Sequence, residues 1–492
     1  KSFEHKPWKF RYKTDRSCCA GSYRKIKILK RNFTVRQSIT DTELTLETKK
    51  ISVLVWEYSI PAIIGTLVNS LYNIVDRIFI GQGVGAYAIS GLAITFPVTI
   101  LASSLGMLVG VGAASRISIS LGERKKHTAE QILGNSLILI LLFNAVIMTL
   151  FYVYLDPILL AFGATANTLP YAREYLQIVL IGNVFISLCY SFNNMMRASG
   201  YPKKAMITML IGALLNIILD PVFIFVFDLG IAGVAWATVI SMFVGMLFVM
   251  HHFIQDSSLI RLRKENIRLN KNIVLAIVSI GLSPFFMQVA ASGVAVLLNT
   301  SLLKHGGDLA VGAYGILNSM LLIIIMTVVG LNQGTQPIIG YNYGAGNFLR
   351  VKDTFFYTVK VATIITSAGF IIGMFFPRQF ASAFTGDQEL LEIAENGIRL
   401  SLIAFPLVGF QVVAGNFFQS IGQAKKAIIQ SLSRQIIFLV PGLLIFPALL
   451  GLNGVWIAMP VSDFLASLLS LYLLVGQIRI IRNMQENQPL YR

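Results

Sequence analysis

Residues 194–205 are NMMRASGYPKKA, and residues 416–427, 222 positions later, are NFFQSIGQAKKA. The same spacing, within a residue, relates residues 229–234 (LGIAGV) to residues 450–455 (LGLNGV). Landmarks that keep one offset indicate a duplicated unit of about 220 residues. In a membrane protein, such a duplication is typical of transporters whose binding site lies between the two halves.

The composition is that of a membrane protein. Of the 492 residues, 55% are hydrophobic and 13% are charged, against about 25% charged in a typical soluble domain. Three cysteines in a chain of this length predict no disulfide framework. The net charge of +17 would suggest nucleic-acid binding in a soluble protein, but about half of the excess precedes residue 50, where fourteen Lys/Arg accompany five Asp/Glu. Because most of the rest lies in alternate short loops, we expect no nucleic-acid partner.

Twelve apolar stretches follow residue 50, most of them around the length of about 20 residues that spans a bilayer as a helix. We therefore predict an all-α integral membrane protein. Residues 1–50 are polar, basic and aperiodic, without the apolar core of a signal peptide, and we predict a disordered cytoplasmic tail. Binding of its basic residues 24–36 to the lipid surface is the alternative. The predicted spans are 55–80, 88–112, 131–155, 172–196, 205–227, 232–254, 273–297, 311–335, 355–376, 395–419, 428–449 and 454–476.

Lysine and arginine concentrate in every second loop. By the positive-inside rule both termini are cytoplasmic and the chain is a multi-pass protein of the cytoplasmic membrane. An even number of helices in each half makes the two repeats parallel. We predict an N-lobe of six helices at 51–254, a cytoplasmic linker at 255–272, a C-lobe of six helices at 273–476 and a cytoplasmic tail at 477–492. The basic residues that decide the orientation are Arg116, Arg124, Lys125, Lys126, Arg197, Lys203, Lys204, Arg261, Arg263, Lys264, Arg268, Lys271, Arg350, Lys352, Lys425, Lys426, Arg479 and Arg482.

Three carboxylates lie well inside the spans: Asp76, Asp220 and Asp463. An ionisable group in the hydrocarbon costs several kcal/mol, so each is a candidate functional residue. In the predicted topology Asp76 and Asp220 share a depth in the outer half of the bilayer with Thr238. Asn216 precedes Asp220 by four positions and shares its helix face. Asn69, Tyr72, Asn73 and Asp76 form a second polar stripe, with the i, i+3, i+4, i+7 spacing that faces a helix bundle.

Two nearby carboxylates in a low dielectric should not both be charged. One of them can take a proton, or both can ionise around Na⁺, since oxygen ligands from Asp76, Asp220, Asn216 and Thr238 suit a hard cation. The second repeat lacks this set, because Asp76 corresponds to Asn299 and Asp220 falls at Pro441 or Gly442. We therefore expect the coupling-ion site in the N-lobe, with H⁺ and Na⁺ both open. Packing of the two aspartates against neighbouring helices, without an ion, is the alternative.

Pro61 lies in the first span, 15 residues before Asp76. A proline removes a backbone hydrogen bond and permits bending, so Pro61 predicts either a static kink or a helix that bends with protonation. The sequence has no G-x-x-x-x-G-K-[ST] motif, so an ATP motor is not expected. We predict a secondary transporter, not an enzyme, with no cofactor besides the coupling ion.

These residues resemble the multidrug and toxic compound extrusion (MATE) family, in its bacterial drug-export branch. The resemblance covers about residues 51–480. It rests on Pro61 with Asp76, on N-x-x-x-D-P at 216–221, on G-x-x-G-V-A-W-A-T at 230–238, on R-A-x-G at 197–200 and on Q-P-x-x-G-x-N-x-G-A-G-N at 336–347. Jointly these motifs are specific, although each is weak alone.

The resemblance implies two six-helix lobes that form a V around a central cavity, and antiport of amphipathic organic cations against H⁺ or Na⁺. It implies that Asp76, Asn216, Asp220 and Thr238 form the ion site, and by spacing alone it adds Tyr175. Acidic residues that some members carry in helices seven and ten are missing here, which leaves the N-lobe site. We expect a monomer in the lipid bilayer. The alternative function is a flippase for lipid-linked oligosaccharide or polysaccharide precursors, which Arg434 in the eleventh span would favour.

Overall fold

The computed structural model describes residues 45–486, and these residues contain helices and no strand. The predicted tail residues 1–44 and 487–492 lie outside the described residues. The N-lobe contains α2 (Ile51–Gly83), α3 (Ala86–Gly122), α4 (Lys126–Val153), α5 (Leu155–Ala161), α6 (Leu169–Ala198), α7 (Pro202–Pro221), η1 (Val222–Val226) and α8 (Gly230–Ile254). The C-lobe follows with η2 (Lys264–Asn266), α9 (Lys271–Gly344), α10 (Phe348–Phe375), α11 (Pro377–Ser382), α12 (Gln388–Leu402), α13 (Phe405–Ser420), α14 (Ala424–Leu432), η3 (Ser433–Leu439), α15 (Val440–Leu450) and α16 (Leu452–Glu486).

The prediction of twelve transmembrane helices is confirmed. Ten helices in the described chain are long and apolar enough to cross a membrane, and the bent pair α12 and α13 adds an eleventh span. The twelfth lies in α9, whose 74 residues would extend about 110 Å if straight, several times the bilayer thickness. α9 is instead broken at Gly307, where φ is 66° and ψ is −165°. A positive φ favours glycine, and here it turns the chain back between the seventh and eighth spans.

Several helices extend beyond the apolar stretches that predicted them. α3 continues to Gly122 and α16 to Glu486, each ten residues past the predicted end of its span. Arg116 and Arg197 consequently lie inside helices and not in loops. Hydropathy marks the part of a helix that contacts lipid. The helical hydrogen bonds of the backbone can continue beyond that part into the aqueous phase, so hydropathy does not locate the helix ends.

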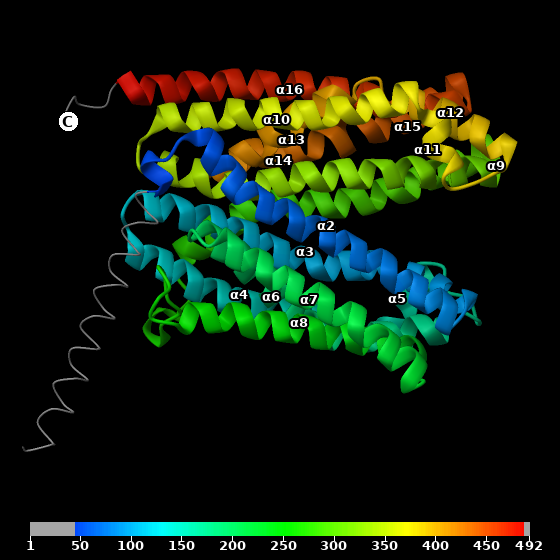
Figure 1. Ribbon diagram of the computed structural model, residues 1–492, viewed down its shortest axis with the longest axis horizontal. Helices are drawn as coiled ribbons and strands as arrows, with labels where there is room; N and C mark the ends of the chain where they lie inside the picture. The colour runs from blue at the N-terminus through cyan, green and yellow to red at the C-terminus, as the bar shows by residue number, and fades with distance from the viewer. Residues whose placement is uncertain (1–44, 487–492) are drawn as a thin grey trace, which may run out of the picture.

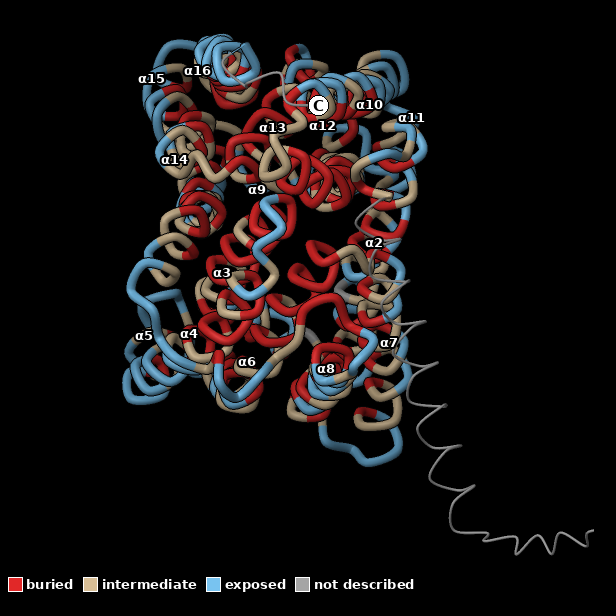
Figure 2. Tube along the Cα trace, turned by 90° about the vertical axis from the view of Figure 1, so that its left-hand side faces the viewer, coloured by how far each residue is buried: buried red, intermediate tan, exposed pale blue. Residues whose placement is uncertain are grey.

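The two lobes lie side by side, with α2 running obliquely between them (Figure 1). We call the end that carries Arg124 and the first turns of α7, α10 and α14, with Lys203, Arg350 and Lys425, the basic end. One hydrophobic core extends through both lobes and contains residues from each, among them Leu133 of the N-lobe and Ile338 of the C-lobe. Two further cores belong to the N-lobe alone and another to the C-lobe alone. α3 and α9 lie at the centre of the molecule, where much of α3 and most of residues 328–342 of α9 are buried (Figure 2).

Small residues allow the lobes to approach closely toward the basic end. A Cβ atom at Gly281 would lie 1.8 Å from the carbonyl oxygen of Leu108, and one at Gly344 would lie 2.1 Å from that of Ile119. Such close backbone contact between helices is typical of glycine in membrane proteins. Hydrogen bonds join the lobes in the same half, from Ser115 Oγ to the Gln419 carbonyl (2.6 Å).

On α2, Thr66 Oγ1 donates across the lobes to the Met326 carbonyl (3.2 Å). Asp76 lies ten residues further along the helix, about 15 Å beyond this contact. The lobes are therefore joined toward the basic end, and the predicted ion site lies in the part of the N-lobe that has its own core.

Candidate functional site

Three N-lobe helices bring the predicted ion-site residues together. Asp76 comes from α2, Asn216 and Asp220 come from α7, and Thr238 comes from α8. Asp220 is 0% exposed, Asn216 is 1% exposed and Asp76 is 8% exposed. The carboxyl groups of Asp76 and Asp220 lie close enough to interact as hydrogen-bonding partners. Residues 144 positions apart thus share one buried site, and neither aspartate faces the acyl chains.

The site is rich in oxygen acceptors and poor in donors. The Asn216 side-chain amide donates to Asp220 Oδ1 at 3.4 Å and to Thr238 Oγ1 at 3.5 Å, both long contacts. Three oxygen atoms are buried without a hydrogen-bond partner: Asp76 Oδ1, Asn216 Oδ1 and Asp220 Oδ2. A buried acceptor without a donor costs roughly 1–3 kcal/mol. A proton or a hard cation would satisfy these oxygens, and the donor set fits either one.

The backbone changes where Asp220 lies. Pro221 follows it and ends α7, and the chain continues as a π-helical turn, η1. A proline cannot donate the hydrogen bond that would continue the α-helix, and π-turns occur frequently at functional sites. The turn closes with a hydrogen bond from the Phe227 amide to the Val222 carbonyl (3.1 Å). Asp220 is therefore held in the last turn of α7, against α2.

Tyr175 reaches the same region from a fourth helix, α6. It packs beside the small N-lobe core that contains Ile80 and Ile224. It lies within electrostatic range of Asp76, Asp220 and Tyr72. In the sequence, Tyr175 is a candidate only because its spacing matches a site tyrosine of the family that the chain resembles. In the structure it lies near both carboxylates.

The remaining members of the polar stripe lie on α2, before Asp76. Asn69 and Tyr72 each interact with other groups of the protein. The side chain of Asn73 lies outside the described residues. The stripe as a whole therefore stays a prediction, with Tyr72 tied to the site through its proximity to Tyr175.

Pro61 does not lie at the ion site. It is buried in α2, about 22 Å along the helix from Asp76, where α2 crosses the second arm of α9. Ser59 Oγ donates there to the Leu331 carbonyl (3.3 Å), and a Cβ atom at Gly330 would lie 2.6 Å from Ile63 Cα. Pro61 therefore marks the contact between the lobes, and any influence on Asp76 must pass along α2.

The C-lobe does not reproduce the site. Asn299, the counterpart of Asp76, is exposed, and the counterpart of Asp220 is the exposed Pro441 or the buried Gly442, neither of which carries a carboxylate. The C-lobe instead buries an ion pair that sequence reasoning missed. Arg434 Nε donates to Asp463 Oδ1 at 2.5 Å, with the guanidinium 31% exposed and the carboxylate 3% exposed. Arg434 is thus neutralised by Asp463 within its own lobe.

A second group that the sequence did not predict lies in the N-lobe interior. The Asn183 amide donates to Asn144 Oδ1 (2.7 Å), and Ser187 Oγ donates to the same oxygen (3.3 Å). These three residues link α4 to α6 and contain no titratable group, so their role is packing between helices. Among the described residues, no group of three or more His, Cys, Asp or Glu is arranged to hold a metal ion.

Comparison with known proteins agrees with this architecture. The family model MatE matches residues 61–222 and 284–444, two segments related by the offset of the duplication. The Multidrug export protein MepA of Staphylococcus aureus (strain NCTC 8325 / PS 47) is 30% identical over 430 residues, which cover 86% of this chain and 94% of MepA.

Two solved structures extend the likeness to the fold. The MATE multidrug transporter DinF-BH is 38% identical, with a TM-score of 0.82 over 87% of this chain and 96% of that one. A multidrug resistance MATE family transporter in an outward-facing conformation is 27% identical, with a TM-score of 0.82 over 89% of this chain and 99% of that one. Together with the twelve helices in two lobes, these matches show that the chain belongs to the MatE family and is a membrane transporter, not an enzyme.

Proposed function

We propose that this transporter exports amphipathic organic cations across the cytoplasmic membrane in exchange for H⁺ or Na⁺. The ion binds at Asp76 and Asp220, with Asn216 and Thr238 as further oxygen ligands. The observation that carries the proposal is the set of three buried, partnerless oxygens on Asp76, Asn216 and Asp220. The similarity to the Multidrug export protein MepA supports drug-like cargo.

Orientation follows from the basic loops. With the basic end in the cytoplasm, both termini are cytoplasmic, and the lobes are joined on the inner side. The ion site then lies in the outer half of the N-lobe. This arrangement corresponds to an outward-facing state, in which a proton or Na⁺ from outside reaches the aspartates before cargo is released.

Exchange requires that ion and cargo favour different states. A ligand shifts a conformational equilibrium only through its differential affinity for the two states. A proton or Na⁺ on Asp76 and Asp220 removes the negative charge that attracts a cationic cargo, and so favours release outside. Movement of the lobes then exposes the site inward, where the ion leaves and a new cation binds. The chain acts as a monomer in this scheme.

The charge of the interior favours cationic cargo over a pyrophosphate-linked glycan. Asp76 and Asp220 form an acidic site, and neither forms an ion pair with a lysine or arginine among the described residues; Arg77, next to Asp76 on α2, acts on it at longer range. Arg434 is the residue that favours the flippase alternative, but its charge is balanced by Asp463. The Arg434–Asp463 pair therefore does not form a cationic site for pyrophosphate.

Dye transport into everted membrane vesicles tests the proposal. Asp76→Asn and Asp220→Asn should each reduce accumulation of a cationic dye to the level of vesicles without the transporter, because an amide cannot exchange a proton and binds Na⁺ poorly. Asp256→Asn, at an exposed residue of the linker, is the matched control and should transport normally. Parallel gradients of H⁺ alone and Na⁺ alone identify the ion. Wild-type rates in both site variants would disprove the proposal.

A further inference from the structure

A groove opens on the C-lobe surface near the basic end. α10 and α16 form its two walls, and α13 lies behind them. The cavity has a volume of about 480 Å³, within the roughly 300–1,000 Å³ of small-molecule sites. We call it the α10–α16 groove. It belongs neither to the ion site nor to the contact between the lobes.

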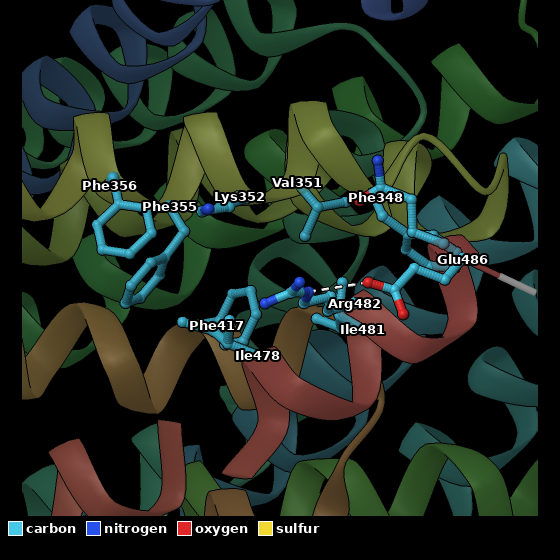
Figure 3. Close-up of a pocket in the computed structure, with 11 residues that line it drawn as sticks. Phe348, Val351, Lys352, Phe355, Phe356, Phe417, Ile478, Ile481, Arg482 and Glu486 are labelled. Atoms are coloured by element: carbon cyan, nitrogen blue, oxygen red, sulfur yellow. Dashed lines mark hydrogen bonds and ion pairs between the residues drawn. The ribbon is translucent and has the colours of Figure 1, made fainter. Parts of the chain in front are cut away.

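The groove is apolar at one end and charged at the other. Phe355 and Phe417 pack with ring centroids 4.8 Å apart, and Phe356 beside them is 47% exposed. Lys352 and Arg482 lie on opposite walls nearer the basic end. Figure 3 shows Phe355, Phe356 and Phe417 together at one end, with Phe348, Arg482 and its partner Glu486 towards the other.

Because the two lobes are repeats, the groove can be compared with the equivalent surface of the N-lobe. α4 and α10 begin 222 residues apart, as do α8 and α16, so α4 and α8 form the equivalent surface of the N-lobe. There the linker fills the space. Leu259 and Ile260 are buried, and a Cβ atom at Gly134 would lie 2.2 Å from the Asn266 carbonyl oxygen.

The two surfaces carry opposite charge at one equivalent position. In the N-lobe Glu130 is buried and pairs with Arg263 of the linker at 3.4 Å. The residue 222 positions later is Lys352, on the groove wall. Likewise Gly134, which makes room for the linker backbone, corresponds to the exposed Phe356. The N-lobe surface thus receives a cationic segment of the chain, whereas the C-lobe surface offers a cation and an exposed ring.

We propose that the α10–α16 groove binds one anionic glycerophospholipid of the cytoplasmic leaflet, with its phosphate between Lys352 and Arg482 and an acyl chain along Phe355, Phe356 and Phe417. The basic end lies at the level of the headgroups, where clustered Lys and Arg attract anionic lipid, and the aromatic end lies deeper, in hydrocarbon. Arg482 bonds Glu486 at 2.9 Å, with the two side chains 78% and 60% exposed. An exposed pair of this kind is weak, so a phosphate displaces Glu486 readily.

The charge of the groove also argues against the chain's own C-terminal residues as its occupant. The six residues after Glu486 are NQPLYR, with no acidic side chain. Their one charged side chain is an arginine, which would not pair with Lys352 and Arg482. The proposal rests on the orientation given under the proposed function and not on the coupling ion.

Native mass spectrometry of the full-length, detergent-solubilised protein tests the proposal, because it counts bound lipids without any transport. Phosphatidylglycerol should bind more tightly than phosphatidylcholine of the same chain length. Each of Lys352→Gln and Arg482→Gln should weaken phosphatidylglycerol binding by about fivefold, and leave phosphatidylcholine binding unchanged. Glu486→Gln should tighten it, an effect that misfolding cannot mimic.

Arg479→Gln is the control, since Arg479 is an exposed arginine of the same helix that does not line the groove. If it weakens binding as much as Arg482→Gln, the effect is general surface charge and the proposal fails. Equal affinity for the two lipids also overturns it. So does several-fold tighter lipid binding after truncation at Glu486, because the tail would then be the occupant. Dye transport by the same variants is measured separately, so a failed antiport mechanism leaves this test intact.

Discussion

At the scale of single residues, the ion site depends on oxygen atoms that the protein itself leaves unsatisfied. Asp220 is wholly buried, yet Asp220 Oδ2 and Asp76 Oδ1 accept no hydrogen bond from the protein. The side-chain amide of Asn216 has two N–H groups. It donates to Asp220 and to Thr238, and both hydrogen bonds are long. A site with this shortage of donors is stabilised by a bound cation or proton. The same shortage makes its occupancy reversible.

Asn216→Leu removes both an oxygen ligand and a donor to Asp220. If Na⁺ is the ion, loss of the Asn216 oxygen ligand should raise the Na⁺ concentration at half-maximal transport about tenfold, because hydrogen bonds and contacts to charged groups contribute about 1.5–3 kcal/mol. If H⁺ is the ion, loss of the amide donor to Asp220 destabilises the carboxylate, so the H⁺ concentration at half-maximal transport should fall. Initial rates of dye transport across a range of ion concentrations measure this shift. An unchanged half-maximal concentration would remove Asn216 from the site.

The Arg434–Asp463 pair makes a prediction about stability. Removing one partner of a buried ion pair costs roughly 3–5 kcal/mol, whereas removing both costs much less. Arg434→Gln should therefore lower the thermal unfolding temperature strongly, and Arg434→Gln combined with Asp463→Asn should recover much of it. Dye-based unfolding in detergent measures both. A double variant no more stable than Arg434→Gln would mean that the pair is not the source of the effect.

At the scale of helices, the sequence predicts how deep a charged residue lies in the bilayer. It does not predict which neighbouring helix that side chain faces. The apolar spans and the basic loops place Asp76, Asp220 and Thr238 at one level, and the structure brings the first two together. Arg434 and Asp463 were also visible as charges inside spans. Their pairing was not predicted, because hydropathy fixes how deep a residue lies and says nothing of which neighbour its side chain meets. Helix ends were missed for a related reason, since α3 and α16 continue as helices beyond the lipid.

Gly281 tests the close packing of α9 on α3. A Cβ atom there would meet the Leu108 backbone at 1.8 Å, whereas Gly293 on the same helix has open space around it. Gly281→Ala should destabilise the protein by about 1–3 kcal/mol through overpacking, while Gly293→Ala should be neutral or slightly stabilising. Thermal unfolding of the two variants compares them directly. Equal unfolding temperatures would contradict the contact between α3 and α9.

At the scale of the whole molecule, duplication and asymmetry have separate roles. The 222-residue offset and the twelve apolar spans were enough to predict two lobes of six helices. The packing of these lobes through small residues toward the basic end was not predicted. The carboxylates of the proposed ion site lie in one copy. Asp76 corresponds to the exposed Asn299, Asp220 corresponds to Pro441 or Gly442, and Glu130 corresponds to Lys352. In the proposed mechanism the two lobes share a fold, and only the N-lobe binds the ion.

The most direct test of the central claim is the number of ions displaced when cargo binds. Purified protein in weakly buffered detergent solution is titrated with a cationic dye, while pH and free Na⁺ are recorded. We predict the release of at least one H⁺ or Na⁺ per dye bound by the wild type, and none by Asp220→Asn. Dye binding without release of either ion by the wild type would contradict the account.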